Sequence, residues 1–413
     1  MVFYELYIEK FAGTFQGLTA KLTYLRELGV NAIHILPFYP SPMVDDGYDV
    51  TDYISVRPEL GTIDHFKILV NEAEKLEIKI VVDLVLNHTS TLHPWFLDAV
   101  SNPNGEKHDY YIWSNTGTEL KKAQNPFHEF KDRNWIFEDQ TETYYYSTFY
   151  PEQADLNWDN PNVLKEMLAV VDFWVSLGVA GFRLDAASHL IKREDSLSVG
   201  LPETHEIIKK IRKHLDEKYS EKRIILIAES SEQEGDAARK YFGDGDECHL
   251  VYHMTLASRL LLAFVRGDDS MINEQLNTDA NLPKYCRWLN YVSNHDEILL
   301  TDLNDDERRE ILDFLKPPKD LLFKKDRSIA SRLAPLLYGD ASKILRIYDA
   351  LKRTDGDTLI YYGEEIGMGN DFSVEHPRDI RRYLRGTFPW EEANRKINNS
   401  ESLYHQLSKL LKA

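Results

Sequence analysis

The chain has 413 residues, of which 49 are Lys or Arg and 68 are Asp or Glu, so its formal net charge is −19. A chain this acidic repels phosphate groups, and its basic clusters are short and interrupted, so we exclude nucleic acid as a partner. Hydrophobic residues make up 43% of the chain and charged residues 28%, which is typical of a water-soluble protein with a large core. The length allows two or three average domains, or one large barrel domain.

The cysteine content and the apolar runs bear on the compartment. Cys248 and Cys286 are too few for a disulfide framework, so we expect reduced and buried thiols. The N-terminal segment lacks the basic and apolar regions of a signal peptide, and the longest apolar runs are too short to span a bilayer. We therefore expect a cytoplasmic protein that does not associate with membranes.

Short, near-continuous apolar runs alternate with amphipathic helical patterns along the chain. The first helical pattern carries Leu18, Leu22 and Leu25 at helical spacing, and a later one opens with Asn160 as a capping residue and Pro161 behind it. Eight such strand-then-helix units predict an α/β fold, the (β/α)8 TIM barrel, with a parallel sheet. The expected strands are Val2–Ile8, Asn31–Leu36, Ile78–Val85, Val179–Leu184, Ile224–Ala228, His249–His253, Trp288–Val292 and Thr358–Tyr362.

One connection interrupts this alternation. Residues 88–159, which follow the third strand, are rich in Asn, Pro, Tyr and Trp, and a connection that long and aromatic favours a folded insertion over disorder. We therefore expect a small subdomain at 88–159 over the mouth of a catalytic barrel formed by 1–87 and 160–413. A second irregular and charged stretch, 304–327, is expected to be a surface excursion.

Polar residues stand at the ends of several predicted strands. Asp185, Glu229 and Asp296 each follow an apolar run, and the carboxyl ends of barrel strands meet at one mouth. The single residues could equally cap helices or form surface pairs, but the whole set in strand order favours one acidic cleft. Neighbouring residues at the same ends are Arg183, His88 and His295.

Carboxylates gathered in one cleft are typical of α-glycoside cleavage with retention of configuration. One carboxylate attacks the anomeric carbon, a second group protonates the leaving oxygen, and further negative charge stabilises the oxocarbenium-like transition state. Arg183 lies two residues before Asp185 on the same strand face, which favours an ionised nucleophile at Asp185.

The sequence resembles the α-amylase family of retaining α-glycoside hydrolases and transglycosidases. The motifs that carry the resemblance are DLVLNH (83–88), QADLN (153–157), GFRLDAASH (181–189), IAES (227–230) and SNHD (293–296). The resemblance implies that Asp185 is the nucleophile, Glu229 the general acid/base and Asp296 the transition-state stabiliser. It further implies that Arg183, His88 and His295 surround the glucose that is cleaved, with Tyr48 stacking on its ring and Asp49 binding its hydroxyls.

Strings outside these motifs resemble the trehalose synthase branch of the family, whose members interconvert maltose and trehalose. They include LPFYPSPMVDDGYDVTDY (36–53), LPETHEIIKKIR (201–212) and YYGEEIGMGN (361–370). The implied substrates are small α-glucosides: maltose, trehalose and short malto-oligosaccharides. Hydrolysis by an α-glucosidase or amylase-type activity is the alternative, because a relative can keep these strings and change its reaction. A sugar-binding scaffold without catalysis is disfavoured, because nucleophile and acid are both present.

Several positions depart from the family pattern. Relatives often hold Ca²⁺ near the positions of Asn87 and Asp155, but Lys192 stands where the branch has an acid, so we hypothesise that its ammonium replaces the cation. No cofactor is then required. Residues 378–390 lie where relatives place an arginine that pairs with the aspartate of the GYD motif, which is Asp49 here. Arg381, Arg382 and Arg385 are the candidates, and we select Arg382.

Two further expectations concern the surface and the lone histidines. Relatives usually carry a β-sandwich after the barrel, and because the chain stops near the eighth barrel helix, the face it would cover could instead be buried in a homo-oligomer. His34 and His93 are expected to fill structural roles.

Overall fold

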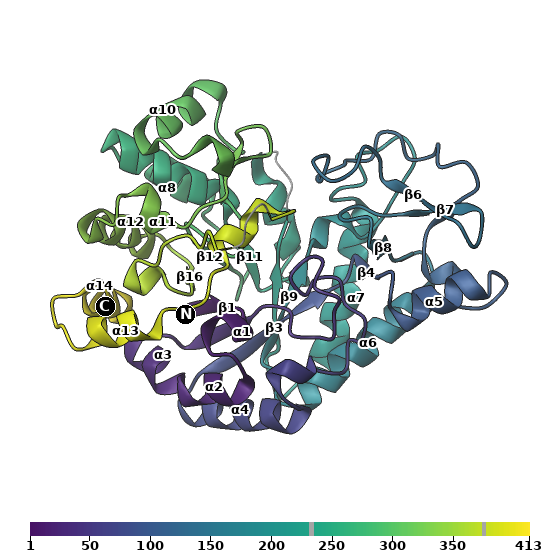
Figure 1. The fold of residues 1–413 in the computed structure, drawn as a ribbon, viewed down its shortest axis with the longest axis horizontal. Helices are drawn as coiled ribbons and strands as arrows, with labels where there is room; N and C mark the ends of the chain where they lie inside the picture. The colour runs from purple at the N-terminus through teal and green to yellow at the C-terminus, as the bar shows by residue number, and fades with distance from the viewer. Residues whose placement is uncertain (231–234, 374–376) are drawn as a thin grey trace.

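Eight parallel strands close into a barrel in the computed structural model, which describes residues 1–230, 235–373 and 377–413. The strand order around the barrel is β1-β16-β12-β11-β10-β9-β3-β2, so each barrel strand lies beside the strand that precedes or follows it in the barrel series (Figure 1). The predicted (β/α)8 barrel is therefore confirmed. The barrel strands are β1 Val2–Leu6, β2 Ala32–Ile35, β3 Lys79–Val85, β9 Gly181–Asp185, β10 Ile225–Ala228, β11 Leu250–Tyr252, β12 Arg287–Asn290 and β16 Asp357–Tyr361.

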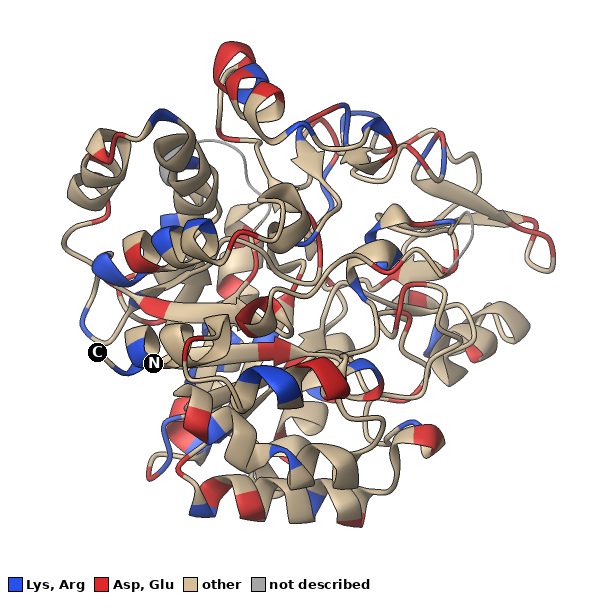
Figure 2. Cartoon of the chain, turned by 60° about the vertical axis from the view of Figure 1, so that its left-hand side comes forward, with Lys and Arg blue, Asp and Glu red and all other residues tan. Residues whose placement is uncertain are grey.

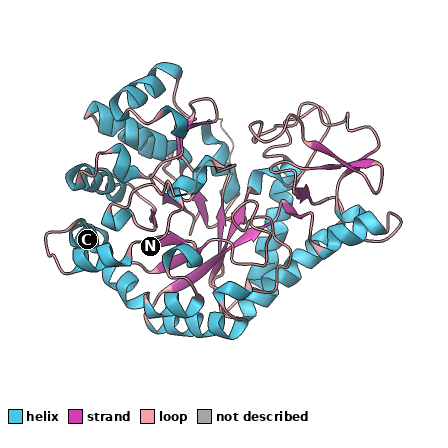
Figure 3. Ribbon diagram, viewed as in Figure 1, coloured by secondary structure: helices cyan, strands magenta, loops and turns pink. Residues whose placement is uncertain are grey.

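The strands are apolar because both of their faces are buried. Side chains that point inward form an inner cluster, while the outward ones pack against the helices in a separate, larger cluster. Figure 3 shows the strands at the centre with helices around them. The inner cluster includes Phe3, Ala32, Val81, Ile227, Leu250 and Leu359.

The helices begin where the sequence offers capping groups. The Asn160 side chain accepts a hydrogen bond from the backbone N–H of Asn162 and Pro161 occupies the first turn, as predicted, while Thr62 and His65 form a capping box. The longer helices are α4 Ile63–Lys75, α6 Pro161–Ser176, α7 Pro202–Lys218, α8 Met254–Arg266, α9 Ser270–Thr278, α10 Asp305–Leu315, α12 Ala341–Arg353 and α14 Leu403–Lys412. The shorter ones are α1 Ile8–Phe11, α2 Phe15–Ala20, α3 Leu22–Leu28, α5 Pro94–Ser101, α11 Leu333–Leu336 and α13 Trp390–Ile397.

The segment after β3 folds into small antiparallel sheets beside the barrel. Strand β4 (His88–Ser90) pairs with β8 (Gln153–Asp155), and a second sheet has the order β5-β7-β6. Its strands are β5 Trp113–Ser114, β6 Trp135–Glu138 and β7 Thr143–Tyr146. Figure 1 shows this unit set off to the right of the barrel.

The charged stretch 304–327 lies largely at the surface, as expected, but its structure is more regular than we expected from the sequence. Its first half is the exposed helix α10, which carries acidic and basic residues together at the top of Figure 2. Its second half enters a three-stranded sheet formed by β13 (Ile298–Leu299), β14 (Leu322–Phe323) and β15 (Ser328–Ile329). This hairpin brings Lys324 to the pocket that Asp185, Glu229 and Asp296 line, and the charged sequence gave no indication of that return.

Two sequence expectations about thiols and membranes can be compared with the structure. Cys248 and Cys286 are both buried and both carry free thiols. Within the described ranges, every helix is too short or too polar to cross a lipid bilayer.

Candidate active site

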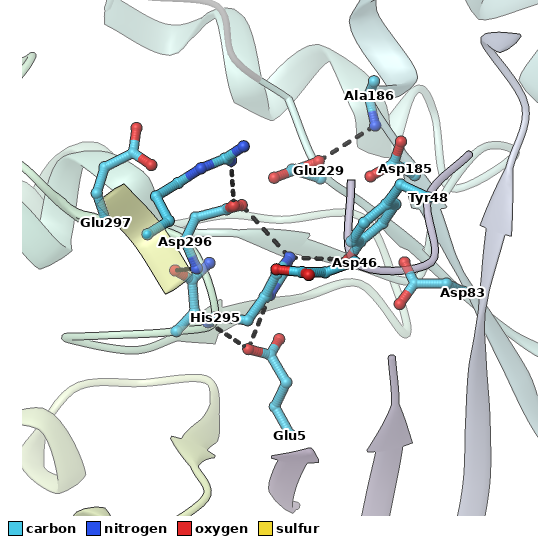
Figure 4. A network of polar contacts seen from close by, with 12 residues as sticks. Glu5, Asp46, Tyr48, Asp83, Asp185, Ala186, Glu229, His295, Asp296 and Glu297 are labelled. Carbon is cyan, nitrogen blue, oxygen red and sulfur yellow. Dashed lines mark hydrogen bonds and ion pairs between the residues drawn. The ribbon is translucent and has the colours of Figure 1, made fainter. Parts of the chain in front are cut away.

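The strand ends bring the three predicted carboxylates to one pocket. Asp185 is the last residue of β9, Glu229 directly follows β10, and Asp296 lies in the loop after β12. All three line the same pocket, and Tyr48 and His88 line it with them. Figure 4 shows the carboxylates around one space, with Glu5 beneath them. The convergence that the strand order predicts is therefore present.

Arg183 joins two of these carboxylates. Its Nη1 lies 2.8 Å from Oδ1 of Asp185, and its Nη2 lies 2.9 Å from Oε2 of Glu229. The backbone N–H of Ala186 donates a further hydrogen bond to Glu229 at 3.1 Å. Burial raises the pKa of Asp185, while Arg183 opposes the rise. The two carboxyls therefore lie on one guanidinium, which favours the ionised form of Asp185 that a nucleophile needs.

Asp296 has a different electrostatic environment. Oδ1 accepts hydrogen bonds from Arg381 at 2.6 Å and from Arg385 at 3.1 Å. Burial alone would raise the pKa of Asp296, but His295 and the two arginines lower it well below its usual range. Asp296 is therefore an anion at neutral pH.

Tyr48 and two histidines complete the wall around this space. The Tyr48 ring stacks on His295 with centroids 5.6 Å apart, and its hydroxyl lies 2.8 Å from Nε2 of His295. Burial lowers the pKa of His88 to about 4, so this imidazole is neutral at physiological pH. Its Nε2 lies 3.2 Å from the carbonyl oxygen of Tyr48. Neutral, buried hydrogen-bonding groups of this kind suit the hydroxyls of a sugar.

Three of the predicted site residues, Asp49, Arg183 and Arg382, lie outside the pocket lining. The buried Asp49 accepts hydrogen bonds from Ser41 and from the backbone N–H groups of Val44 and Asp45, so it stabilises its own loop. Asp45 lines the pocket instead, and burial raises its pKa to about 7.

In the segment 378–390, the arginines that reach the pocket are not the one that we selected from the sequence. Arg382 donates to the carbonyl oxygens of Met43 and Val44, which leaves it beside the pocket. Arg381 and Arg385, the other two candidates, face the pocket and bind Asp296. The short helical turn Ile380–Leu384 separates the three side chains, and an irregular turn of this kind has no readable period in the sequence.

Further lining residues were missed by sequence reasoning. Phe127 and Phe149 come from the 88–159 unit, and Lys324 comes from the β14–β15 hairpin. Lys324 pairs with Glu297, the residue after Asp296. Lys324, Lys325 and Asp326 all have left-handed backbone conformations, with φ of 52°, 56° and 62°. Three consecutive non-glycine residues in that region are uncommon, so no turn signal marks the hairpin.

The Lys192 ammonium is surrounded by oxygen atoms at the junction of the barrel and the inserted unit. Its ammonium lies 2.6 Å from Oδ2 of Asp155, 2.7 Å from Oδ1 of Asn87 and 2.5 Å from the carbonyl oxygen of His189. The side chain is buried rather than turned to solvent. The Lys192 ammonium already fills the space between Asn87 and Asp155, so these two residues do not fit a Ca²⁺ ion in addition to it. Among the described residues no group of three or more His, Cys, Asp or Glu side chains is placed to hold a metal ion.

Comparisons with known proteins place this geometry in a wider context. The family model for the α-amylase catalytic domain matches residues 7–316. The trehalose synthase of Thermus thermophilus is 38% identical over 413 aligned residues, which cover 98% of this chain and 42% of that protein. The trehalose synthase/amylase of Mycobacterium tuberculosis (strain ATCC 25618 / H37Rv) is 39% identical over 380 residues, which cover 89% of this chain and 62% of that protein.

The solved structures agree on the fold. An isomaltulose synthase from Klebsiella sp. LX3 superposes with a TM-score of 0.75 at 22% identity, covering 100% of this chain and 83% of that one. The α-amylase from H. orenii superposes with a TM-score of 0.75 at 25% identity, covering 100% of this chain and 81% of that one. The chain spans only 42% to 62% of the length of the two curated relatives described above.

Proposed function

We propose that this chain, which belongs to the α-amylase catalytic domain family, is a retaining enzyme of small α-glucosides that interconverts maltose and trehalose. The observation that carries the proposal is the contact of one guanidinium, that of Arg183, with both Asp185 and Glu229. The choice of sugars is supported by the two relatives described as trehalose synthases, which are 38% and 39% identical along most of the chain. Short malto-oligosaccharides are further candidate substrates.

The first half of the reaction uses Asp185 as the nucleophile. A carboxylate oxygen of Asp185 attacks the anomeric carbon of a terminal α-glucose as the bond to the glycosidic oxygen breaks. Glu229 gives its proton to that leaving oxygen, which yields a β-glucosyl ester on Asp185 and a free sugar. Asp296, held as an anion by its arginines, stabilises the positive charge that develops on the sugar ring.

The second half returns the glucosyl group to the sugar that was released. After maltose is cleaved, the anomeric hydroxyl of the released glucose attacks the anomeric carbon of the glucosyl ester. The bond from that carbon to Asp185 breaks, Glu229 takes the hydroxyl proton, and trehalose forms with Asp185 again a free carboxylate. The glucose must turn in place without escaping, which requires a pocket that excludes water. Tyr48, Phe127 and Phe149 line the pocket and supply apolar faces for that purpose.

Hydrolysis is the second candidate function. Water then attacks the anomeric carbon of the same intermediate with Glu229 as base, and the bond to Asp185 breaks to release glucose, so the same residues serve both outcomes. The observation that favours it is the relative described as trehalose synthase/amylase. The partition between the two reactions depends on how long the released glucose stays in the pocket relative to the entry of water.

The reaction as proposed needs no metal or other cofactor. Every step uses carboxylates of the chain, and the Lys192 ammonium supplies the positive charge between Asn87 and Asp155. The cytoplasmic location and the homo-oligomer that the sequence suggests stay predictions.

Product analysis tests the proposal. The protein is incubated with maltose, and separately with trehalose, and the sugars are followed by NMR. We expect trehalose from maltose with little free glucose, and the reverse from trehalose. Glucose as the sole product would establish the hydrolase instead, and a folded protein inert on both sugars would refute the proposed substrates.

A further inference from the structure

His34 has a carboxylate oxygen on each of its two ring nitrogens. Nδ1 lies 3.1 Å from Oε2 of Glu5, and Nε2 lies 3.0 Å from Oδ2 of Asp83. The ring is buried, as are both acids. A neutral imidazole carries one N–H, so it could donate to only one of two carboxylates, whereas an imidazolium donates to both. The contacts therefore indicate a buried, positively charged His34.

The strand register explains why these three residues meet. Glu5 on β1 lies opposite His34 on β2, and Asp83 on β3 lies opposite Arg183 on β9. Side chains alternate between the two faces of a strand, so residues two positions apart point to the same side. Each of these four residues lies two positions after a residue that points into the barrel, and therefore points inward as well. The inward residues one layer below are Phe3, Ala32, Val81 and Gly181. The charges thus form a layer of the barrel interior, directly below the catalytic pocket.

Each carboxylate beside His34 also binds a residue of the pocket. Oε1 of Glu5 accepts hydrogen bonds from the backbone N–H of His295 at 2.8 Å and from its Nδ1 at 2.9 Å, as Figure 4 shows. Oδ1 of Asp83 pairs with Arg183, the arginine that binds the nucleophile and the acid. His34 therefore lies midway on a continuous chain of charged contacts from His295 to Arg183.

We propose that His34 is a positioning residue, whose imidazolium keeps Glu5 and Asp83 ionised and so holds both sides of the catalytic pocket in orientation. The inference rests on the proposed function, since the residues it orients are those assigned to that reaction. His34 touches no substrate, and its effect passes through the two carboxylates.

The electrostatic surroundings agree with this geometry. Burial would lower the pKa of His34, but Asp83 and Glu5 raise it to about 9. Burial would raise the pKa of both acids, yet their basic partners lower it. Tyrosine hydroxyls also face this layer: that of Tyr252 lies 3.1 Å from Glu5, and that of Tyr39 donates to the carbonyl oxygen of Asp83. Tyr48 and Tyr291 face the same two acids.

The first test measures the protonation of His34 without any turnover. Histidine is labelled with ¹⁵N in the intact chain, and the signals are assigned by comparison with His34→Gln and His295→Gln. We expect both nitrogens of His34 to be protonated at pH 7 and to titrate near pH 9. In His34→Gln we expect the His295 signals to shift. A neutral His34 at pH 7, or His295 signals that His34→Gln leaves unchanged, would overturn the proposal.

The second test measures the pH dependence of the reaction. His34→Gln removes the charge, so Glu5 and Asp83 are protonated at higher pH; we expect the acidic limb of kcat/KM to move up by about one unit. We expect kcat to fall by about 10- to 100-fold, with little change in KM. The matched control is His93→Gln, which changes a buried histidine that caps α5. A melting temperature that falls without any change in the pH profile would assign His34 a purely structural role.

A double variant further distinguishes a positioning role of His34 from a purely structural one. If His34 acts through Glu5, the loss in Glu5→Gln/His34→Gln should be smaller than the product of the two single losses. Multiplicative losses would contradict the route through Glu5. Inactivity of the unaltered protein on both sugars would refute the proposed function, whereas the NMR outcomes would still decide whether His34 is charged and whether it orients His295.

Discussion

Two buried cations hold the catalytic pocket together in different ways. His34 lies in the floor, the charged layer of barrel strands formed by Glu5, His34, Asp83 and Arg183, where strand register sets every contact. Lys192 lies in the wall, where one ammonium joins the end of β3 to the inserted unit through Asn87 and Asp155. The floor is thus fixed by the barrel strands themselves, while in the wall the Lys192 ammonium adds a charged contact to the pairing of β4 with β8.

The largest expected effect comes from removing the nucleophile that lies above the floor, which leaves the structure of the floor in place. Asp185→Asn keeps the shape of the side chain but cannot attack the anomeric carbon, so we expect activity on maltose to fall by a factor of about a thousand or more. Product NMR measures the loss, and circular dichroism checks the fold. The exposed Asp195→Asn is the matched control. An Asp185→Asn protein of near-normal activity would place the nucleophile elsewhere.

Removing the cation of the wall should affect stability more than chemistry. Lys192→Met leaves Asp155 as a buried and uncompensated carboxylate, so we expect the free energy of unfolding to fall by about 3–5 kcal/mol. Urea denaturation measures this difference. Lys192→Met/Asp155→Asn removes both charges and should recover part of the loss. A Lys192→Met protein as stable as its parent would show that the ammonium does not hold the wall.

The charge on His34 should make the protein less stable as the pH becomes alkaline. The pKa of His34 rises from an ordinary 6.5 to about 9 in the folded chain. Its contribution is therefore complete below about pH 6.5 and is lost as the pH passes through about 9. The free energy of unfolding from pH 6 to pH 10 should fall by up to about 3 kcal/mol more in the parent than in His34→Gln. Parallel curves for the two proteins would contradict this.

The smallest expected effect is that of a chelator. Because the Lys192 ammonium fills the space between Asn87 and Asp155, we expect exhaustive treatment with EDTA to leave both activity and melting temperature unchanged. A calcium-dependent amylase treated in parallel shows that the chelator works. A clear loss of either property, restored by added Ca²⁺, would refute the role assigned to Lys192.

The sequence predicted the parts of the site that regular structure positions. Asp185, Glu229 and Asp296 follow barrel strands, so a pattern of apolar runs was enough to bring them together. Irregular backbone hid the rest. The choice of Arg382 over its neighbours and the role given to Asp49 both fell on loops, whose turns carry no period.

Long-range contacts were equally hidden from the sequence. Lys324 reaches the pocket through left-handed residues in a stretch that reads as a solvated surface. The charge of His34 depends on two acids from other strands, and the sequence alone suggested a structural histidine. Such residues could be found only by combining the strand register with the inward alternation of side chains.

The central claim is that Asp185 forms a covalent bond to glucose, and trapping that intermediate tests it most directly. The protein is treated with 5-fluoro-α-D-glucosyl fluoride, which forms such an ester faster than the ester breaks down, and is then digested for mass spectrometry. We expect one added fluoroglucosyl group on the peptide that contains Asp185, and none in Asp185→Asn. An unlabelled but folded protein, or a label on any other carboxylate, would contradict the account.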